Sequence, residues 1–266
     1  MESYLIKGGT IVDGTLTPAY SADVRVKDGK IAEIGTALPE NDETVVDAQG
    51  CLVTPGFIES HTHFDATMWW QNDLDPLPGY GATTMVIGNC GFSAAPVPDS
   101  QAVRDEIIGI FAFFEDIAKE PFTKELPWDW NKWSDYKRSM TAKVKLPLNF
   151  AAFVGHIAIR LAVMGLDGWT RAATAEEVER MAELLDDALA AGALGLSTNL
   201  LDHDAEDRPI PTLLADDAEF RALFAVLDRY PGTVFQVITD VFVRMTGPAS
   251  VERLARLLEG TNVRMQ

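Results

Sequence analysis

Two histidines separated by one residue, His61 and His63, are the residues in this sequence with the clearest capacity for chemistry. The chain has four histidines, and these two follow a short apolar run, Phe57-Ile58, that is preceded by Pro55-Gly56. Because side chains alternate along a β-strand, we expect both imidazoles to point to the same side. Two imidazoles at the end of a buried strand can bind one metal ion together, although an isolated H-x-H pair is more often structural.

A second candidate ligand lies at the end of another apolar run. Residues 82–87 lead into Gly88-Asn89-Cys90-Gly91, which carries one of only two cysteines. Zn²⁺ accepts nitrogen and sulfur ligands in tetrahedral geometry, so a thiolate beside two imidazoles would suit it. The sequence therefore predicts a metal site formed by His61, His63 and Cys90.

Composition and charge describe an ordinary globular protein. The 266 residues are 47% hydrophobic and 23% charged, which is enough to bury a full core. A net charge of −18 argues against nucleic acid or an anionic membrane as a partner, since both favour a basic surface. We expect no transmembrane helix and no signal peptide, because the required apolar runs are absent. Two cysteines cannot build a disulfide framework, which predicts a cytoplasmic protein.

Residues 1–54 have the pattern of short strands joined by tight turns. Strands are expected at Tyr4-Leu5-Ile6 and Thr10-Ile11-Val12, and Asp28-Gly29 predicts a two-residue hairpin turn. Cys51 is expected to pack in the core as a small hydrophobic residue. Taken alone, this segment could be a free-standing β module.

From residue 55 to residue 266 the pattern changes to alternating strands and helices, which indicates a parallel sheet or barrel. Strands are predicted near residues 57–61, 83–88, 149–154, 193–197 and 233–238, and residues 262–266 look like the start of a sixth. A closed (β/α)8 TIM-type barrel has eight strands and takes about 250 residues by itself. The predicted fold class is therefore α/β, an incomplete TIM-type barrel of about five to six strands. It would be either part of a longer protein or completed by a partner chain or homo-oligomer, and an open sheet is a less favoured alternative.

A helical, tryptophan-rich insertion near residues 97–145 separates the second and third strands. It begins with an amphipathic helix predicted over roughly residues 101–119, and a second helical piece follows from Trp128. Trp128, Trp130 and Trp133 either form a substrate-facing aromatic wall or pack the insertion in place. We favour packing, because tryptophan buries a large area.

Three helices are predicted after the insertion. Thr174 and Glu177 form a capping box that opens the first of them. Asp216 or Asp217 starts the next, and the last runs near residues 250–259.

The motifs around the candidate ligands resemble those of a known family. The stretch P-G-F-I-x-x-H-T-H-x-D from residue 55, followed by G-A-T-T-x-V-x-G-N-C-G-F-S-x-A-P over residues 81–96, resembles the amidohydrolase superfamily. Within it, the sequence is similar to the N-acyl-D-amino-acid deacylase (D-aminoacylase) branch. The G-N-C-G-F-S-x-A-P box is the specific part, because many metal-dependent hydrolases share H-x-H. Further matches lie at residues 153–156 and 190–198, and the likeness weakens after about residue 230.

The resemblance implies a hydrolase of a linear amide bond that uses zinc, as one or two divalent ions, and acts on a small acylated amino acid. It places His61 and His63 as the first two ligands and Cys90 as the cysteine that replaces the bridging modified lysine of other branches. It also assigns residues 1–54 to a small β-sandwich beside the barrel. The family's catalytic aspartate lies on the last barrel strand, beyond the end of this chain, so no catalytic residue is assigned.

Two alternatives to N-acyl-D-amino-acid deacylation stay open. The first is a cyclic amide or imide hydrolase of the same superfamily. The second is a non-catalytic fragment or subunit that needs a partner to complete the barrel. The fifth strand carries Gln236 and no histidine, where the family has a ligand, and this departure favours the second alternative.

Further residues are expected to support the ligands or to line the pocket. Asp65 either orients a ligand imidazole or caps the next segment, and His156 is explained equally well as a structural group. His203 lies in an acidic loop, for which a solvated run of charges is the commoner explanation. Arg160 and Arg208 are candidates to pair with a substrate carboxylate. The supporting set is Asp65, Asn89, His156, Arg160 and His203.

Overall fold

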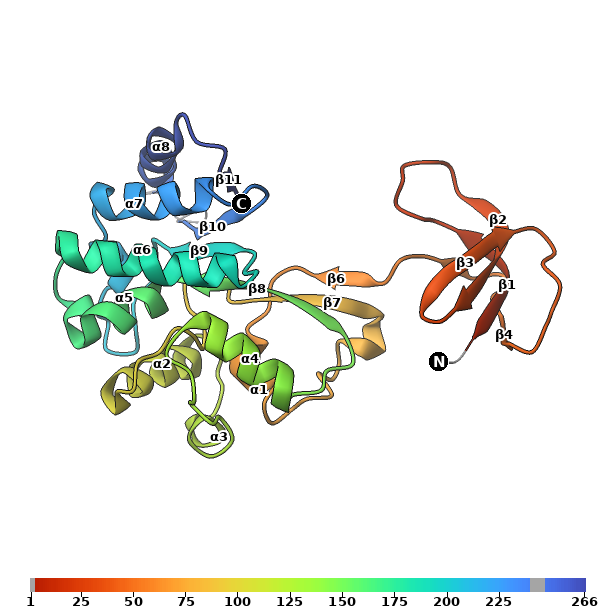
Figure 1. The fold of residues 1–266 in the computed structure, drawn as a ribbon, viewed down its shortest axis with the longest axis horizontal. Coiled ribbons are helices and arrows are strands. Elements are labelled where there is room, and N and C mark those ends of the chain that lie inside the picture. The colour runs from red at the N-terminus through yellow and green to blue at the C-terminus, as the bar shows by residue number, and fades with distance from the viewer. Residues whose placement is uncertain (1–2, 240–246) are drawn as a thin grey trace. The chain divides into compact units, whose positions relative to one another are not determined.

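The computed structural model describes residues 3–239 and 247–266, and the chain divides into two compact units at Phe57. Residues 1–57 contain one sheet, drawn in red and orange in Figure 1. Its strand order is β3-β2-β1-β4, and β5 also pairs with β1. The strands are β1 (Tyr4–Ile11), β2 (Tyr20–Lys27), β3 (Lys30–Gly35), β4 (Thr44–Asp47) and β5 (Leu52–Val53).

The turn chemistry of the first unit explains its register. Strands β2 and β3 are antiparallel around Asp28-Gly29, and both turn residues have positive φ, 52° and 73°, which confirms the predicted hairpin. The two strands expected around Gly8-Gly9 are instead one strand. It shifts register between Ile6 and Gly9, and Gly8 takes the left-handed backbone conformation there, with a φ of 72°.

The prediction that Cys51 packs in the core is wrong. Its side chain is exposed. Cys51 lies in the turn before β5, where its N–H donates to the carbonyl of Ala48 and its own carbonyl accepts the N–H of Thr10. The backbone is therefore tied into the sheet while the thiol faces outward.

The described residues from 58 to 239 and from 247 to 266 form a curled half-barrel, which agrees with the predicted α/β, TIM-type fold class. Its sheet has the order β11-β10-β9-β8-β7-β6, so each strand lies beside its neighbour in sequence. The registered pairs from β7 to β11 are all parallel. The strands are β6 (Phe57–Glu59), β7 (Ala82–Ile87), β8 (Asn149–Gly155), β9 (Gly195–Asn199), β10 (Val234–Ile238) and β11 (Arg264–Met265). All six predicted strands are present, with ends shifted by a few residues.

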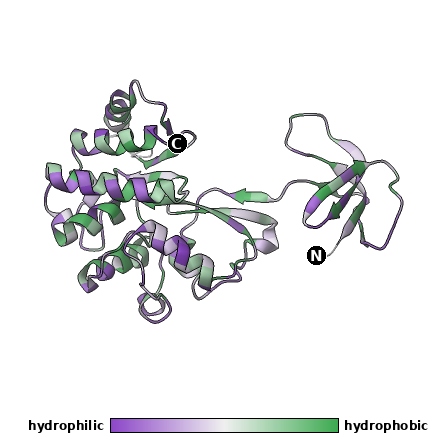
Figure 2. Cartoon of the chain, in the orientation of Figure 1, coloured by the Kyte–Doolittle hydropathy of each residue, from purple (hydrophilic) through white to green (hydrophobic). Residues whose placement is uncertain are grey.

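Helices connect these strands and cover the sheet (Figure 1). Figure 2 shows both polar and hydrophobic residues around α6 and α7, as expected for helices with one buried face. The capping box is confirmed, because the Thr174 side chain accepts the N–H of Glu177 and the Glu177 side chain accepts the N–H of Thr174. None of the helices within the described residues is long and apolar enough to cross a membrane. The α-helices are α1 (Phe64–Thr67), α2 (Gln101–Phe114), α3 (Lys119–Lys124), α4 (Trp133–Lys143), α5 (His156–Met164), α6 (Ala175–Ala190), α7 (Asp217–Asp228) and α8 (Gly247–Leu258).

The tryptophan-rich insertion packs against the core, as favoured. Trp130 and Trp133 are almost completely buried. The Nε1–H groups of Trp128 and Trp130 donate to the carbonyls of Phe122 and Ala94, at 2.9 Å and 2.8 Å. Helix α2 ends at Phe114, earlier than predicted, and α4 begins only at Trp133.

Candidate metal centre

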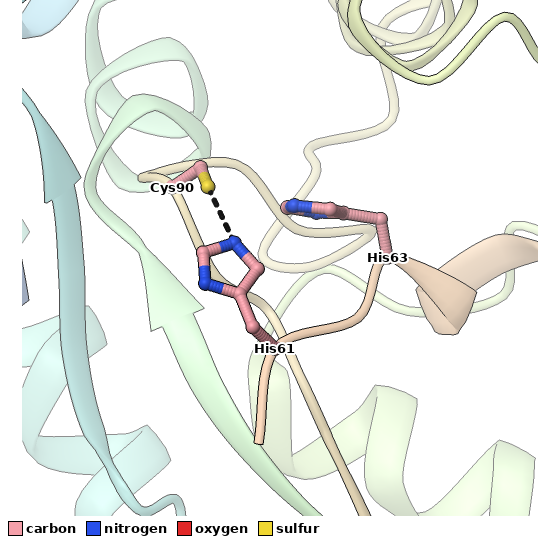
Figure 3. A group of neighbouring side chains, drawn as sticks. All are labelled: His61, His63 and Cys90. Atoms are coloured by element: carbon pink, nitrogen blue, oxygen red, sulfur yellow. Dashed lines mark hydrogen bonds between the residues drawn. The ribbon is translucent and has the colours of Figure 1, made fainter. Parts of the chain in front are cut away.

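His61 and His63 lie in the turn that follows β6, so the strand alternation from which we expected their convergence is absent at these residues. Thr62, the residue between the two histidines, is instead held by hydrogen bonds to β7. The backbone N–H and the hydroxyl of Thr62 both donate to the carbonyl of Val86 in β7, at 3.0 Å and 2.9 Å. This pairing buries the Thr62 side chain and turns the two flanking imidazoles toward a common space beside Cys90 (Figure 3).

Cys90 enters the same space from a tight turn after β7. Its φ is 56°, and Gly88 and Gly91 on either side have φ of 73° and 81°. The Nε2 atom of His61 lies 2.9 Å from the Cys90 sulfur, along the dashed line in Figure 3. One ligand atom from each of His61, His63 and Cys90 lies within 4.8 Å of the other two. In the part of the chain that the structure describes, these three side chains are the one group spaced to hold a metal ion.

Burial disfavours the charged form of each of the three groups when no cation is bound. It lowers the pKa of His63 to about 3, with the neighbouring His61 adding to the effect, and it also lowers the pKa of His61. Burial raises the pKa of the Cys90 thiol to about 12, and the carboxylates of Glu115, Asp202 and Asp65 raise it further. Three acidic side chains thus lie near the site, which favours a cation there.

The donor set fits a zinc-type ion. The Nδ1 atom of His63 is buried and has no hydrogen-bond partner among the described residues, while the ring itself stacks on Phe92 with centroids 4.5 Å apart. Among the described residues neither ring nitrogen of His63 makes a hydrogen bond of normal length, so this imidazole is available to a cation. Two imidazoles and one thiol are the ligand types that zinc prefers. The three residues therefore present the right atoms at the right spacing for such an ion.

Two polar side chains tie the ligand-bearing turns together. The Asn89 amide donates to the carbonyls of Thr62 and Val86, at 3.2 Å and 3.0 Å. The buried Asp65 carboxylate accepts the N–H of Gly88 at 3.1 Å, and burial raises its pKa to about 7. Both residues were predicted as supporting groups, and both contact the turns rather than the shared space.

Two other side chains hold the Cys90 turn through contacts that the sequence did not predict, although Gln236 itself had been singled out there as a departure from the family. The Gln236 side chain in β10 accepts the N–H of Cys90 at 3.0 Å. Ser197 in β9 accepts the N–H of Gly91 at 3.0 Å and donates to the carbonyl of Gly88 at 2.5 Å. The sequence gives no signal for either contact, because both partners are more than a hundred residues away.

His156 and Arg160 lie together in a buried polar cluster at the start of α5. The imidazole nitrogens of His156 lie 3.0 Å from the Thr198 hydroxyl and 2.7 Å from the Glu219 carboxylate. The guanidinium of Arg160 is also fully buried and pairs with Glu219 and with the carbonyl of Arg171. These contacts give both residues structural partners, and a direct substrate contact by either one stays a prediction.

His203 and Arg208 lie in the loop after β9. The His203 side chain is exposed, 3.5 Å from Asp207, and it is not a member of the three-residue ligand group. Arg208 pairs with Asp204 and Glu106, at 2.6 Å and 3.1 Å, above the Trp169 ring. The side chains that His203 and Arg208 contact are therefore mainly acidic residues of the loop and of α2.

Comparison with known proteins identifies relatives in sequence and in structure. The chain is 37% identical over 194 residues to D-aminoacylase of Alcaligenes xylosoxydans xylosoxydans, covering 73% of this chain and 37% of that protein. A solved D-aminoacylase structure with a binuclear metal centre matches with a TM-score of 0.77 at 31% identity. The N-acyl-D-glutamate deacylase of Bordetella bronchiseptica, solved with zinc and a phosphonate inhibitor, matches equally well. Each structural match covers 98% of this chain and 50% of the other.

The chain thus spans half or less of the length of the relatives named here. The model of the amidohydrolase family matches residues 44–264, which include all three candidate ligands and strands β6 to β10 of the half-barrel. The chain belongs to the amidohydrolase family.

Proposed function

We propose that this chain forms the metal-binding part of a hydrolase that cleaves the linear amide bond of N-acyl-D-amino acids. The convergence of His61, His63 and Cys90 after β6 and β7 carries the proposal. Membership of the amidohydrolase family and similarity to proteins named as D-amino-acid deacylases support the reaction class. Because the chain spans only part of these relatives, the activity and substrate of the whole protein belong to the proposal.

Each of the residues around the site has a defined task in this proposal. His61, His63 and Cys90 would hold a divalent ion, which would polarise the scissile carbonyl and lower the pKa of a water molecule. Asp65 and Asn89 hold the two ligand-bearing turns against each other. Gln236 and Ser197 fix the backbone on both sides of the thiol, so the sulfur is positioned before an ion arrives.

The first test is metal content, measured by elemental analysis of protein purified without chelators. We expect the wild-type chain to retain at least one zinc ion and Cys90→Ser and His61→Ala to lose it. Cys51→Ser is the matched control, because Cys51 is an exposed free thiol in the other unit. Zinc retained at the wild-type level by Cys90→Ser would contradict the proposal.

The two unpaired thiols also support a cytoplasmic location.

The second test is a substrate panel, because loops around a pocket rather than the metal motif set specificity. N-acetyl derivatives of D-aspartate, D-glutamate and D-leucine are compared with their L-enantiomers and with a cyclic hydantoin. Hydrolysis of the D-enantiomers, lost in Cys90→Ser, is the expected result. Preferential opening of the cyclic amide would identify the alternative reaction of the same family.

A further inference from the structure

Glu115 lies next to the proposed metal centre, although it comes from the insertion between β7 and β8. It follows the last residue of α2, and its N–H closes that helix on the carbonyl of Phe111. Its carboxylate Oε1 lies 3.5 Å from Nε2 of His63. The side chain is 29% exposed, whereas that of His63 is 9% exposed. Glu115 thus lies where the buried site meets solvent.

Aromatic packing fixes the end of α2 against the ligand histidine. The His63 ring stacks on Phe92, which in turn stacks on Phe114 with centroids 5.6 Å apart. Phe111 packs edge-on against Phe92 at 5.2 Å. Since Phe114 directly precedes Glu115, these rings hold the backbone that carries the carboxylate beside the site. The proximity of Glu115 to His63 therefore follows from buried packing.

The spacing between the two side chains suits shared ligation better than a hydrogen bond. A separation of 3.5 Å is longer than a normal N–H···O bond of about 2.7–3.2 Å. Two ligands about 2.1 Å from one tetrahedral zinc ion lie about 3.4 Å apart. Glu115 is outside the group whose ligand atoms are all within 4.8 Å of one another, so ligation requires its partly exposed side chain to rotate.

We propose that Glu115 is a further ligand of the cation held by His61, His63 and Cys90. This inference rests on the proposed metal centre. Three protein ligands leave one position of a four-coordinate ion to fill, and a carboxylate oxygen is an accepted zinc ligand. A carboxylate and a thiolate together would also balance the two positive charges of the ion. Gln236 in β10 does not supply this ligand, because its side-chain oxygen already accepts the N–H of Cys90.

The test is the zinc affinity of the 266-residue chain, measured by competition with a chromophoric chelator at neutral pH. Glu115→Gln keeps the shape of the side chain and removes its charge, and we expect it to weaken zinc binding by at least about tenfold. Asp116→Asn is the matched control, because it removes the same charge from the adjacent exposed residue. Its affinity should stay within about twofold of wild type. The visible absorption of the Co²⁺-loaded chain, which reports the ligand set, should change only in Glu115→Gln.

Different results would overturn the inference and the proposed function. If Glu115→Gln binds zinc like the wild type while His63→Ala does not, Glu115 is not a ligand and the metal centre stands. If Asp116→Asn weakens binding as much as Glu115→Gln, the effect is one of general charge and the inference is also wrong. If the folded wild-type chain binds no zinc, the metal centre is wrong and the inference with it. Circular dichroism of each variant establishes that it is folded.

Discussion

The side-chain oxygen of Gln236 accepts the backbone N–H of Cys90 at 3.0 Å, across 146 residues of sequence. Gln236 lies in β10 and is almost fully buried. Cys90 has a φ of 56°, a conformation that few residues other than glycine adopt. A strand on the far side of the half-barrel thus stabilises a strained turn that carries a candidate ligand.

Replacing Gln236 should loosen this turn. Gln236→Leu leaves the partly buried N–H of Cys90 without an acceptor, which costs about 1–3 kcal/mol of unfolding free energy. The same change should lower zinc occupancy, because the thiol is no longer held in place. Urea unfolding and elemental analysis measure the two effects. Gln101→Leu on the exposed start of α2 is the control, expected to change stability by less than about 0.5 kcal/mol. Equal stability of the two variants would rule out this role for Gln236.

Gly88 is required by a close approach of two strands. A Cβ atom at Gly88 would lie 2.2 Å from the carbonyl oxygen of Phe153, and the φ of 73° is unfavourable for any other residue. Gly88→Ala should therefore cost the strain of a left-handed residue, about 1–2 kcal/mol, plus about 1–3 kcal/mol for overpacking. Gly260→Ala has a similar φ of 80° and open space around it, so it should show only the first cost. Denaturant unfolding of both variants gives the difference, and equal losses would show that the clash relaxes freely.

Local patterns were enough to predict much of the fold. The hairpin at Asp28-Gly29 and the capping box of Thr174 and Glu177 depend on residues within a few positions of one another, and both are present. The alternation of apolar strands and amphipathic helices likewise predicted the six-stranded half-barrel. The end of α2 was misplaced by the prediction. The backbone turns sharply at Asp116, which has a φ of 53°, and the sequence does not show where that turn falls.

The contacts around the candidate site were less predictable. Local motifs identified His61, His63 and Cys90, but their approach depends on how β6 and β7 curl within the sheet. The hydrogen bond between Ser197 and Gly88 joins residues 109 positions apart. The end of α2, which Glu115 follows, contacts His63 through a stack of aromatic rings. No periodicity in the sequence predicts such contacts between distant residues, since they form only when the strands are assembled side by side.

The buried cluster around Glu219 should make a large contribution to stability. Its carboxylate contacts the fully buried His156 and Arg160. Glu219→Gln leaves the Arg160 guanidinium buried without a counter-charge, and breaking such a pair costs about 3–5 kcal/mol. Thermal and urea unfolding measure the loss, with Glu183→Gln on the exposed face of α6 as the control. A loss no greater than that of the control would show that water or a rearranged partner compensates the guanidinium.

Glu177 should make the stability of the chain depend on pH in the acid range. Its hydrogen bonds to Arg171 and to the N–H of Thr174 lower its pKa from 4.5 to about 2. Because the folded pKa is lowered, its contribution is fully present above pH 4.5 and is lost as the pH falls toward 2. Glu177→Gln keeps a side chain that can complete the capping box and removes the ion pair with Arg171.

The stability difference between wild type and Glu177→Gln should therefore be largest near neutral pH and should shrink steadily below pH 4.5. Urea unfolding at a series of pH values measures it. Glu179→Gln, an exposed residue of the same helix, should show little difference from wild type across the series. A difference for Glu177→Gln that stays constant down to pH 2.5 would mean that the ion pair with Arg171 contributes nothing to folding, and that the capping box alone holds the start of α6.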